Sequence, residues 1–230
     1  MTNEIIPYLE MCQCEGLSLQ RGMNFRAGKT YSIILMSVRR NAPYRDRVEN
    51  DGLTLIYEGH DIPKQNIGTD PKAIDQPEFT PAGTLTENGK FHKAAQDSKQ
   101  SLRPREIVRV YEKIHNGIWS YNGEFQLVDS WQENEGGRKV FKFKLIAFAN
   151  ISRKQPPLGA NDEGPSRIIP TSVKLKVWKR DGGKCVVCGA TNELHFDHII
   201  PFSKGGTSLK ADNVQLLCAR HNLEKKDKIA

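Results

Sequence analysis

Four residues near the C-terminal end have the types and the spacing of zinc ligands. Cys185 and Cys188 belong to the stretch "CVVC", and Cys218 and His221 belong to "CARH", each pair with two residues between its members. A two-residue spacer lets a tight turn aim two side chains at one point, and a tetrahedral zinc ion needs four such sulfur and nitrogen ligands. The sequence therefore predicts a structural Zn²⁺ site made of these four residues.

Between the two pairs lies an Asp-His dipeptide that could do chemistry. Asp197 and His198 stand at the end of an apparent strand, where neighbouring side chains point in different directions. A carboxylate is a hard ligand for a divalent cation, and a histidine with its usual pKa of about 6.5 can take up a proton near neutral pH. The pair could therefore bind a cation and supply a general base. The alternative is an ordinary surface pair before a turn.

Together these stretches resemble the HNH nucleases, the ββα-metal family. "CVVC", "FDHIIP", "ADNVQLLC" and "CARHN" occur in the family's order and are followed by a basic stretch, over residues 184–228. The resemblance implies phosphodiester hydrolysis, with His198 as the base that activates water. It also implies that Asp197 and Asn222 bind a catalytic Mg²⁺, Mn²⁺ or other divalent ion. Asn213 would brace the loop that presents His198.

The adjacent residues His221 and Asn222 allow two registers. In the favoured one, His221 is the fourth zinc ligand, where many relatives have cysteine, and Asn222 faces the catalytic ion. In the competing register, His221 belongs to the catalytic site and zinc keeps only three cysteines. The favoured register completes a tetrahedron and still leaves the nuclease its last ligand.

The elements that must position these residues follow from hydrophobic patterning. We expect strands rich in β-branched and aromatic residues at 30–38, 53–59, 106–114, 123–131 and 139–148. One helix is expected at 88–101 and another at 172–182, directly before the cysteines. Residues 151–170 are rich in proline, glycine and polar residues, the composition of a linker. We therefore predict domains at 1–150 and 171–230.

The first of these domains resembles the SRA (YDG) domain, which flips a modified cytosine out of duplex DNA. The resemblance covers residues 22–148 and depends on "SVRRNAPYRDRVENDGLTLIYEGHD", "LTENGKF" and "SYNGEFQLVDSW". It implies a twisted β-barrel with flanking helices, in which Tyr44 and Tyr57 sandwich the flipped base. Asn88, in the second stretch, is a further expected DNA-binding residue. The predicted fold class is thus α+β, a barrel with a small zinc-stabilised ββα-metal domain.

This resemblance has departures around the expected pocket. Arg47 stands where the family has the aspartate that reads the base edge, and Asp46 stands one position earlier. The span between the two tyrosines has one extra residue, so a shifted loop could still deliver Asp46. Asn122 replaces the aspartate of the YDG segment. We expect Asp46 and Arg47 to contact DNA, but the identity of the recognised modification stays open.

Charge and composition agree with a DNA-binding enzyme inside the cell. The net charge is +7, and residues 171–230 hold 11 Lys and Arg against 6 Asp and Glu. A basic terminal module suggests a polyanionic partner, here double-stranded DNA. The sequence contains neither a long apolar run nor a secretory signal, so we expect a bacterial-type cytoplasmic protein without membrane contact and without disulfides.

The leading interpretation is a modification-dependent restriction endonuclease that cleaves DNA containing 5-methylcytosine or 5-hydroxymethylcytosine. Because one HNH site cuts one strand, we expect a homodimer, at least on DNA. One alternative keeps the nuclease and changes its trigger to phosphorothioate, another modification or an unmodified sequence. A second alternative is a non-catalytic reader of modified DNA whose zinc module is only a scaffold.

Overall fold

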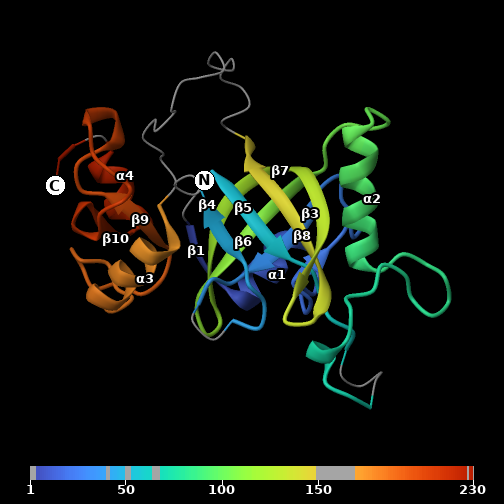
Figure 1. Ribbon diagram of the computed structural model, residues 1–230. Coiled ribbons are helices and arrows are strands. Elements are labelled where there is room, and N and C mark those ends of the chain that lie inside the picture. Colours follow the sequence, from blue (N-terminus) through green and yellow to red (C-terminus); the bar gives the residue numbers. More distant parts are fainter. Residues whose placement is uncertain are drawn as a thin grey trace.

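The computed structural model describes residues 4–39, 42–49, 53–63, 68–148, 169–226 and 228–229. They form a strongly curved sheet with helices on its outside and a small C-terminal unit beside it (Figure 1). The strands are β1 (Glu4–Pro7), β2 (Met23–Asn24), β3 (Ser32–Met36), β4 (Arg47–Glu49), β5 (Thr54–Glu58), β6 (Ile107–His115), β7 (Ile118–Glu135), β8 (Arg138–Ala147), β9 (Leu194–His198) and β10 (Val214–Cys218). The α-helices are α1 (Tyr8–Glu15), α2 (Glu87–Lys99), α3 (Thr171–Arg180) and α4 (Ala219–Lys225), with short 3-10 turns η3 (Pro71–Ala73), η5 (Phe202–Lys204) and η6 (Ala211–Asn213).

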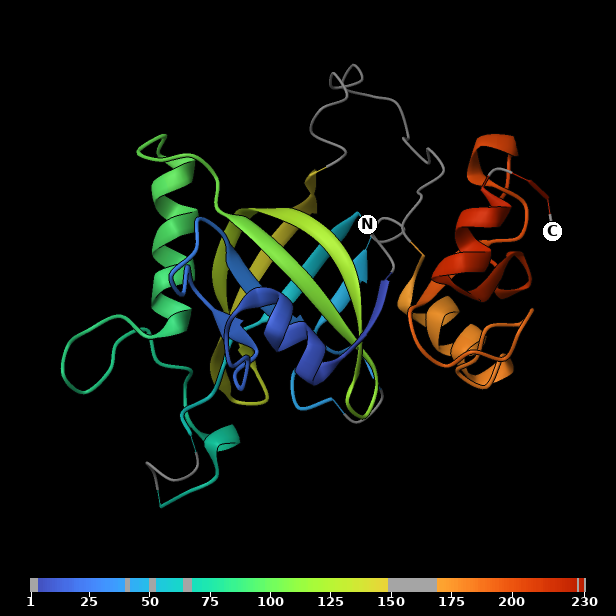
Figure 2. The same ribbon diagram turned by 180° about the vertical axis from the view of Figure 1, so that it is seen from behind.

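The long strand β7 organises the sheet. One of its edges pairs with β6, and the other pairs first with β1 and then with β8. β8 continues to β5 and β4, while β6 continues to β3 in parallel and then to β2. Bulges interrupt both the β6–β7 and the β7–β8 ladders, and bulges increase the local twist. The sheet curls into a barrel-like shape as a result (Figures 1 and 2).

Helix α2 closes one side of this barrel. It begins at Thr86, whose hydroxyl accepts a hydrogen bond from the N–H of Gly89 at 3.1 Å and so caps the helix. Its fully buried Phe91 meets Phe143 of β8 edge to face, with ring centroids 5.8 Å apart. Burying a phenylalanine side chain stabilises a fold by about 1.5–3 kcal/mol. The predicted helix at 88–101 is confirmed.

The predicted strands at 30–38, 53–59, 106–114 and 139–148 correspond to β3, β5, β6 and β8. The one predicted at 123–131 is only the middle of β7. β1 and α1 lie in a segment for which the sequence predicted no element. The α+β fold class is confirmed.

The C-terminal unit shares its sheet and its core with the barrel. β1 pairs with β7 and also with β9, where Glu4 lies opposite His195. Ile5 of β1 and Ile114 of β6 pack into the hydrophobic core of the unit. That core otherwise contains Ile169, Val173, Val177, Cys185, Leu194, Phe196, Val214, Leu216, Leu217 and Cys218. The predicted domain boundaries stay a prediction, because only residues 169 and 170 of the expected linker lie within the described residues.

A buried lysine adds a polar contact between the unit and the barrel. Lys174 of α3 reaches the β6–β7 hairpin and is fully buried there. Its Nζ donates to Asn122 Oδ1 at 2.6 Å and to Ser120 Oγ at 3.1 Å, and lies 3.6 Å from Glu112 Oε2. The side chain that the sequence places on a basic helix therefore holds two parts of the fold together.

Candidate active site

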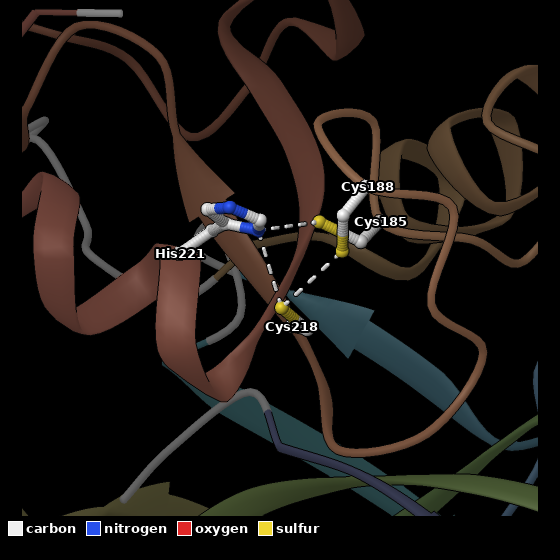
Figure 3. Close-up of side chains that lie close together, drawn as sticks. All are labelled: Cys185, Cys188, Cys218 and His221. Carbon is white, nitrogen blue, oxygen red and sulfur yellow. Dashed lines mark hydrogen bonds between the residues drawn. The ribbon is translucent and has the colours of Figure 1, made fainter.

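Three cysteines and one histidine of the C-terminal unit form one cluster (Figure 3). Cys185 and Cys188 lie in the turn after α3, Cys218 ends β10, and His221 lies in α4. The four ligand atoms all lie within 4.8 Å of one another. The N–H of Gly189 donates to the carbonyl of Cys185 at 2.8 Å, and Gly189 has a φ of 74°, which favours glycine. This tight turn aims both cysteines at the same point.

The spacing of these atoms fits a tetrahedral zinc ion. The Sγ atoms of Cys188 and Cys218 are 3.8 Å apart. His221 Nδ1 lies 3.4 Å from Cys185 Sγ and 3.3 Å from Cys218 Sγ. Zinc–sulfur bonds of about 2.3 Å and zinc–nitrogen bonds of about 2.0–2.1 Å place tetrahedral ligand atoms about 3.5–3.8 Å apart. The cluster is therefore compatible with structural zinc.

The surroundings of Cys185 favour the thiolate that zinc needs. Burial raises the pKa of this thiol, but hydrogen bonds from the backbone of Cys218, Cys188 and Val187 and from the His221 side chain outweigh it. Together they lower the pKa of Cys185 to about 6. Because metal ligands must be deprotonated, this arrangement suits a metal site near neutral pH.

The strand pair β9–β10 places Asp197 and His198 at one end of the small sheet. In the antiparallel register, His198 lies opposite Val214 and Asp197 lies opposite Gln215. Successive side chains of a strand point to opposite faces, so the side chains of Asp197 and His198 leave β9 in different directions. His198 Nε2 is 2.9 Å from Ser208 Oγ, a contact that fixes the orientation of the imidazole ring.

Asn213 lies across the loop that follows His198. Its Oδ1 accepts from the N–H of Ile200 at 2.9 Å, and its Nδ2 donates to the carbonyls of Ile200 at 3.2 Å and Thr207 at 3.0 Å. A Cβ at Gly206 would stand 1.8 Å from the Ile200 carbonyl oxygen, so only glycine fits there. Asn213 thus holds the two sides of the loop together, the bracing role that the resemblance implies.

An ammonium group that the sequence analysis did not place joins α4 to these residues. Lys225 Nζ lies 2.9 Å from Asp197 Oδ2 and donates to the main-chain carbonyl of His198 at 2.6 Å. The Lys225 side chain is only 8% exposed. Its position in a basic C-terminal helix is typical of a solvated lysine, so local sequence carries little signal of this contact.

The position of His221 distinguishes it from the residue that follows. Successive helical residues are rotated by about 100° around the axis, so Asn222 leaves α4 in a different direction from His221. The structure groups His221 with the three cysteines, as the favoured register requires. The role of Asn222 as a ligand of the catalytic ion stays a prediction.

A wide cleft of about 1810 Å³ opens on the barrel. Four of the five expected DNA-binding residues line it: Tyr44, Asp46, Tyr57 and Asn88. The fifth, Arg47, lies on β4 with an exposed side chain that pairs with Glu49 at 2.9 Å. Sequence motifs separated by more than forty residues thus meet around one cavity.

Asp46 is held inside this cleft by backbone amides. Its Oδ2 accepts from the N–H of Ser37 and its Oδ1 from the N–H of Glu58, both at 3.0 Å. Burial raises the pKa of Asp46 to about 7, against the opposing effect of these two hydrogen bonds. Near neutral pH the group can therefore be an acceptor or, when protonated, a donor.

The two aromatic residues are joined by a histidine whose role the sequence analysis did not assign. Tyr57 is 2% exposed, and its hydroxyl lies 2.9 Å from His60 Nε2. Tyr44 stacks on the His60 ring with centroids 5.1 Å apart and an interplanar angle of 14°. Asn88 accepts from the His60 N–H and donates to its carbonyl, both at 2.8 Å. Asn88 therefore positions His60 in addition to lining the cleft.

Comparison with protein families addresses the C-terminal unit directly. Residues 185–228 match the family model described as HNH endonuclease. The chain carries an HNH endonuclease domain. The prediction of a DNA-cleaving hydrolase of this type is confirmed, and the matched range contains the cluster of three cysteines and one histidine, Asp197, His198 and Asn213.

Solved structures similar to this chain include both single domains and restriction enzymes. The SRA domain of SUVH5 in complex with fully methylated CG DNA has a TM-score of 0.45 and 22% identity, covering 67% of this chain and 91% of that one. The modification-dependent restriction endonuclease TagI has a TM-score of 0.43 and 19% identity, covering 97% of this chain and 76% of that one. The DNA modification-dependent restriction endonuclease AspBHI has a TM-score of 0.40 and 14% identity, covering 60% and 66%. With TM-scores below 0.5, these likenesses carry no functional argument.

No curated protein matches this chain. Among the described residues, no helix has both the length and the apolar character that crossing a membrane requires.

Proposed function

We propose that this protein is a modification-dependent DNA endonuclease. The barrel would take a flipped 5-methylcytosine or 5-hydroxymethylcytosine into its cleft, and the HNH domain would hydrolyse phosphodiester bonds of the same DNA. One observation carries the proposal: the HNH domain shares a continuous sheet with a barrel whose cleft gathers aromatic and polar side chains.

The cleft has the chemistry that a flipped base requires. A base taken from the stack loses a few kcal/mol of stacking and pairing energy, which the pocket has to replace. The rings of Tyr44 and Tyr57 line the cleft where a base would stack, and Asp46 offers a carboxyl group to a base edge. Because Asp46 titrates near neutral pH, it can accept from the amino group of cytosine or donate to its ring nitrogen.

In the HNH domain, His198 would deprotonate the attacking water. Asp197 and Asn222 would hold the catalytic divalent ion. A bound Mg²⁺ or Mn²⁺ supplies stabilisation of the negative charge that develops on the scissile phosphate. Ser208 and Asn213 would keep His198 and its loop in place while the reaction proceeds.

The zinc cluster would have a structural role. The cluster connects the turn after α3, the end of β10 and α4 through Cys185, Cys188, Cys218 and His221. A domain this small has a limited apolar core, so metal binding contributes directly to its folding.

Because one HNH site cuts one strand, a double-strand break would require two chains, and we propose a homodimer on DNA.

The test is cleavage of matched duplexes in the presence of Mg²⁺ or Mn²⁺. The substrates share one sequence and contain cytosine, 5-methylcytosine, 5-hydroxymethylcytosine or a phosphorothioate linkage. We expect cleavage of the two modified-cytosine duplexes only. Equal cleavage of all four would remove the modification dependence and leave a plain HNH endonuclease.

The cutting site is tested with the His198→Ala variant. It should lose cleavage while it still binds the methylated duplex in a gel-shift assay. Asn222→Ala should lose cleavage with its zinc content unchanged. Full activity of His198→Ala would remove His198 from the mechanism.

A further inference from the structure

The ring of Tyr44, on which a flipped base is expected to stack, already carries a stacked partner. His60 lies nearly parallel to it, with ring centroids 5.1 Å apart and an interplanar angle of 14°. The ammonium of Lys72 also lies 4.2 Å from the Tyr44 ring centroid, held by an ion pair with Asp61 at 2.9 Å. A base that stacks on Tyr44 therefore has to replace an existing contact.

His60 also contacts the second expected ring. Its centroid is 6.1 Å from that of Tyr57, and its Nε2 lies 2.9 Å from the Tyr57 hydroxyl. The two rings are tilted by 47°, so His60 meets the hydroxyl end of Tyr57 and does not stack on its face. The imidazole therefore stacks on Tyr44 and lies beside the Tyr57 hydroxyl.

The backbone of His60 is fixed, so only its side chain can move. Asn88 is bonded to both the N–H and the carbonyl of His60, at 2.8 Å each. A Cβ on the preceding residue, Gly59, would stand 2.7 Å from Asn88 Oδ1 and 2.6 Å from Gln76 Oε1. On the other side, a Cβ on Gly22 would stand 2.7 Å from both His60 Nε2 and the Tyr57 hydroxyl. With the backbone held in this way, any movement of the imidazole has to be a rotation about its side-chain bonds.

We propose that His60 is a placeholder: in the free protein its imidazole occupies the stacking position on Tyr44, beside the Tyr57 hydroxyl, that the flipped base takes, and it rotates away when the base enters. The inference rests on the proposed function of the cleft. Burial lowers the pKa of His60 to about 4, so the ring is neutral near pH 7, like the base that replaces it.

A placeholder makes base entry a competition. The apparent affinity for a base is proportional to the fraction of molecules in which the site is open, and the protein's own ring lowers that fraction. The competing ring is held by one aromatic stack and one hydrogen bond, and losing both corresponds to a change of roughly tenfold in apparent affinity. This reduction falls on every duplex that inserts a base and spares DNA that inserts none.

The experiment compares three full-length proteins that all contain His198→Ala: one with His60 unchanged, one with His60→Ala and one with His60→Phe. The buffer contains no added Mg²⁺, so that the DNA stays intact, and no chelator, so that zinc is not removed. Binding is measured by fluorescence anisotropy on duplexes with 5-methylcytosine, with cytosine, or with an abasic site at the same position. We expect His60→Ala to bind the methylated duplex roughly tenfold more tightly than wild type and the abasic duplex equally. His60→Phe keeps a ring in place and should show no gain. Weaker binding of the methylated duplex by a folded His60→Ala protein would overturn the proposal.

A second measurement does not depend on the substitution. In the free protein, the NMR signals of the His60 ring should be shifted upfield by the stacked Tyr44 ring. Adding the methylated duplex should move them to ordinary positions, whereas the abasic duplex should leave them unchanged. Unshifted signals in the free protein would contradict the placeholder even if methylated DNA is preferred. If wild type does not distinguish methylated from unmethylated DNA, the proposed function itself is wrong.

Discussion

Replacing Lys174 with methionine should weaken the contact between the HNH domain and the barrel more than replacing any exposed residue. The side chain is fully buried, and its Nζ bonds to Asn122 and Ser120 and faces Glu112. Burial lowers the pKa of Lys174, and the neighbouring Glu112 carboxylate opposes that shift. Methionine has a similar length and can fill the same space without a charge.

The magnitude follows from what the substitution leaves behind. Glu112 is 1% exposed, and without Lys174 its negative charge would stay buried with only the Asn122 amide, 2.9 Å away, donating to Oε2. Its other oxygen, Oε1, has no hydrogen-bond partner within the described part of the chain. Breaking a buried pair so that one charge is left uncompensated costs about 3–5 kcal/mol. For a chain of this size, that lowers the melting temperature by roughly 6–20 °C.

The assay is urea unfolding at fixed zinc concentration, with a double-mutant cycle. Lys174→Met alone should lose about 3–5 kcal/mol, whereas Lys174→Met combined with Glu112→Gln should recover most of it, because a neutral pair leaves no buried charge. Lys179→Met, on the same helix, is the control and should stay within about 0.5 kcal/mol of wild type. If Lys174→Met is as stable as this control, the buried contact does not hold the two parts together.

Three further outcomes are expected. Removing zinc with a strong chelator should unfold the HNH domain while the barrel keeps its strands, measured by the fluorescence of Trp178 and by circular dichroism. The raised pKa of Asp46 gives a stabilisation that is complete below the unfolded-state pKa of about 3.9 and is lost as pH rises through about 7, so Asp46→Asn should flatten the fall in unfolding free energy between these values. Lys225→Met removes the ammonium that competes with a cation for Asp197, so Mn²⁺ titrated by electron paramagnetic resonance should bind roughly fivefold more tightly, equivalent to about 1 kcal/mol of ion-pair energy. Unchanged Mn²⁺ affinity in that variant would contradict the competition.

The cluster of three cysteines and one histidine could be predicted from the sequence because it depends on the spacing of residues that are close in the chain. Two residues between Cys185 and Cys188, and two between Cys218 and His221, are enough to specify turns that aim each pair at one point. Asp197 and His198 could likewise be placed at a strand end from the alternating pattern before them. These predictions did not require knowledge of how the two halves of the chain meet.

β7 was predicted too short for a physical reason that the structure identifies. The pair Asn122 and Gly123 is typical of a turn. In the structure, Val110 lies opposite Gly123 and Tyr111 lies opposite Tyr121, so Asn122 is the extra residue of a bulge. Gly123 has a φ of 97°, a conformation that glycine supplies within the bulged strand. A local pattern cannot distinguish a bulge inside a long strand from a turn between two short ones.

The contacts that sequence analysis missed all depend on tertiary structure. Lys174 and Lys225 lie in basic helices, where lysines are usually solvated, yet each is buried against a partner that is distant in sequence. His60 follows Tyr57 by three residues, but its stacking on Tyr44 depends on where the loop before β4 folds. In each case the sequence shows the residue type but not the distant residue that it contacts.

The β6–β7 hairpin is one of the elements that connect the cleft to the HNH domain. Because side chains alternate along a strand, β6 and β7 present different residues to the two sides of the sheet. Lys113 and Trp119 line the cleft, whereas Glu112 and Ser120 face Lys174 of the HNH domain, and Ile114 and Ile118 pack into its core. Residues that line the cleft and residues that hold the HNH domain are thus direct neighbours in the chain. The β6–β7 hairpin, together with the pairing of β1 with β9, therefore fixes the position of the HNH domain relative to the cleft.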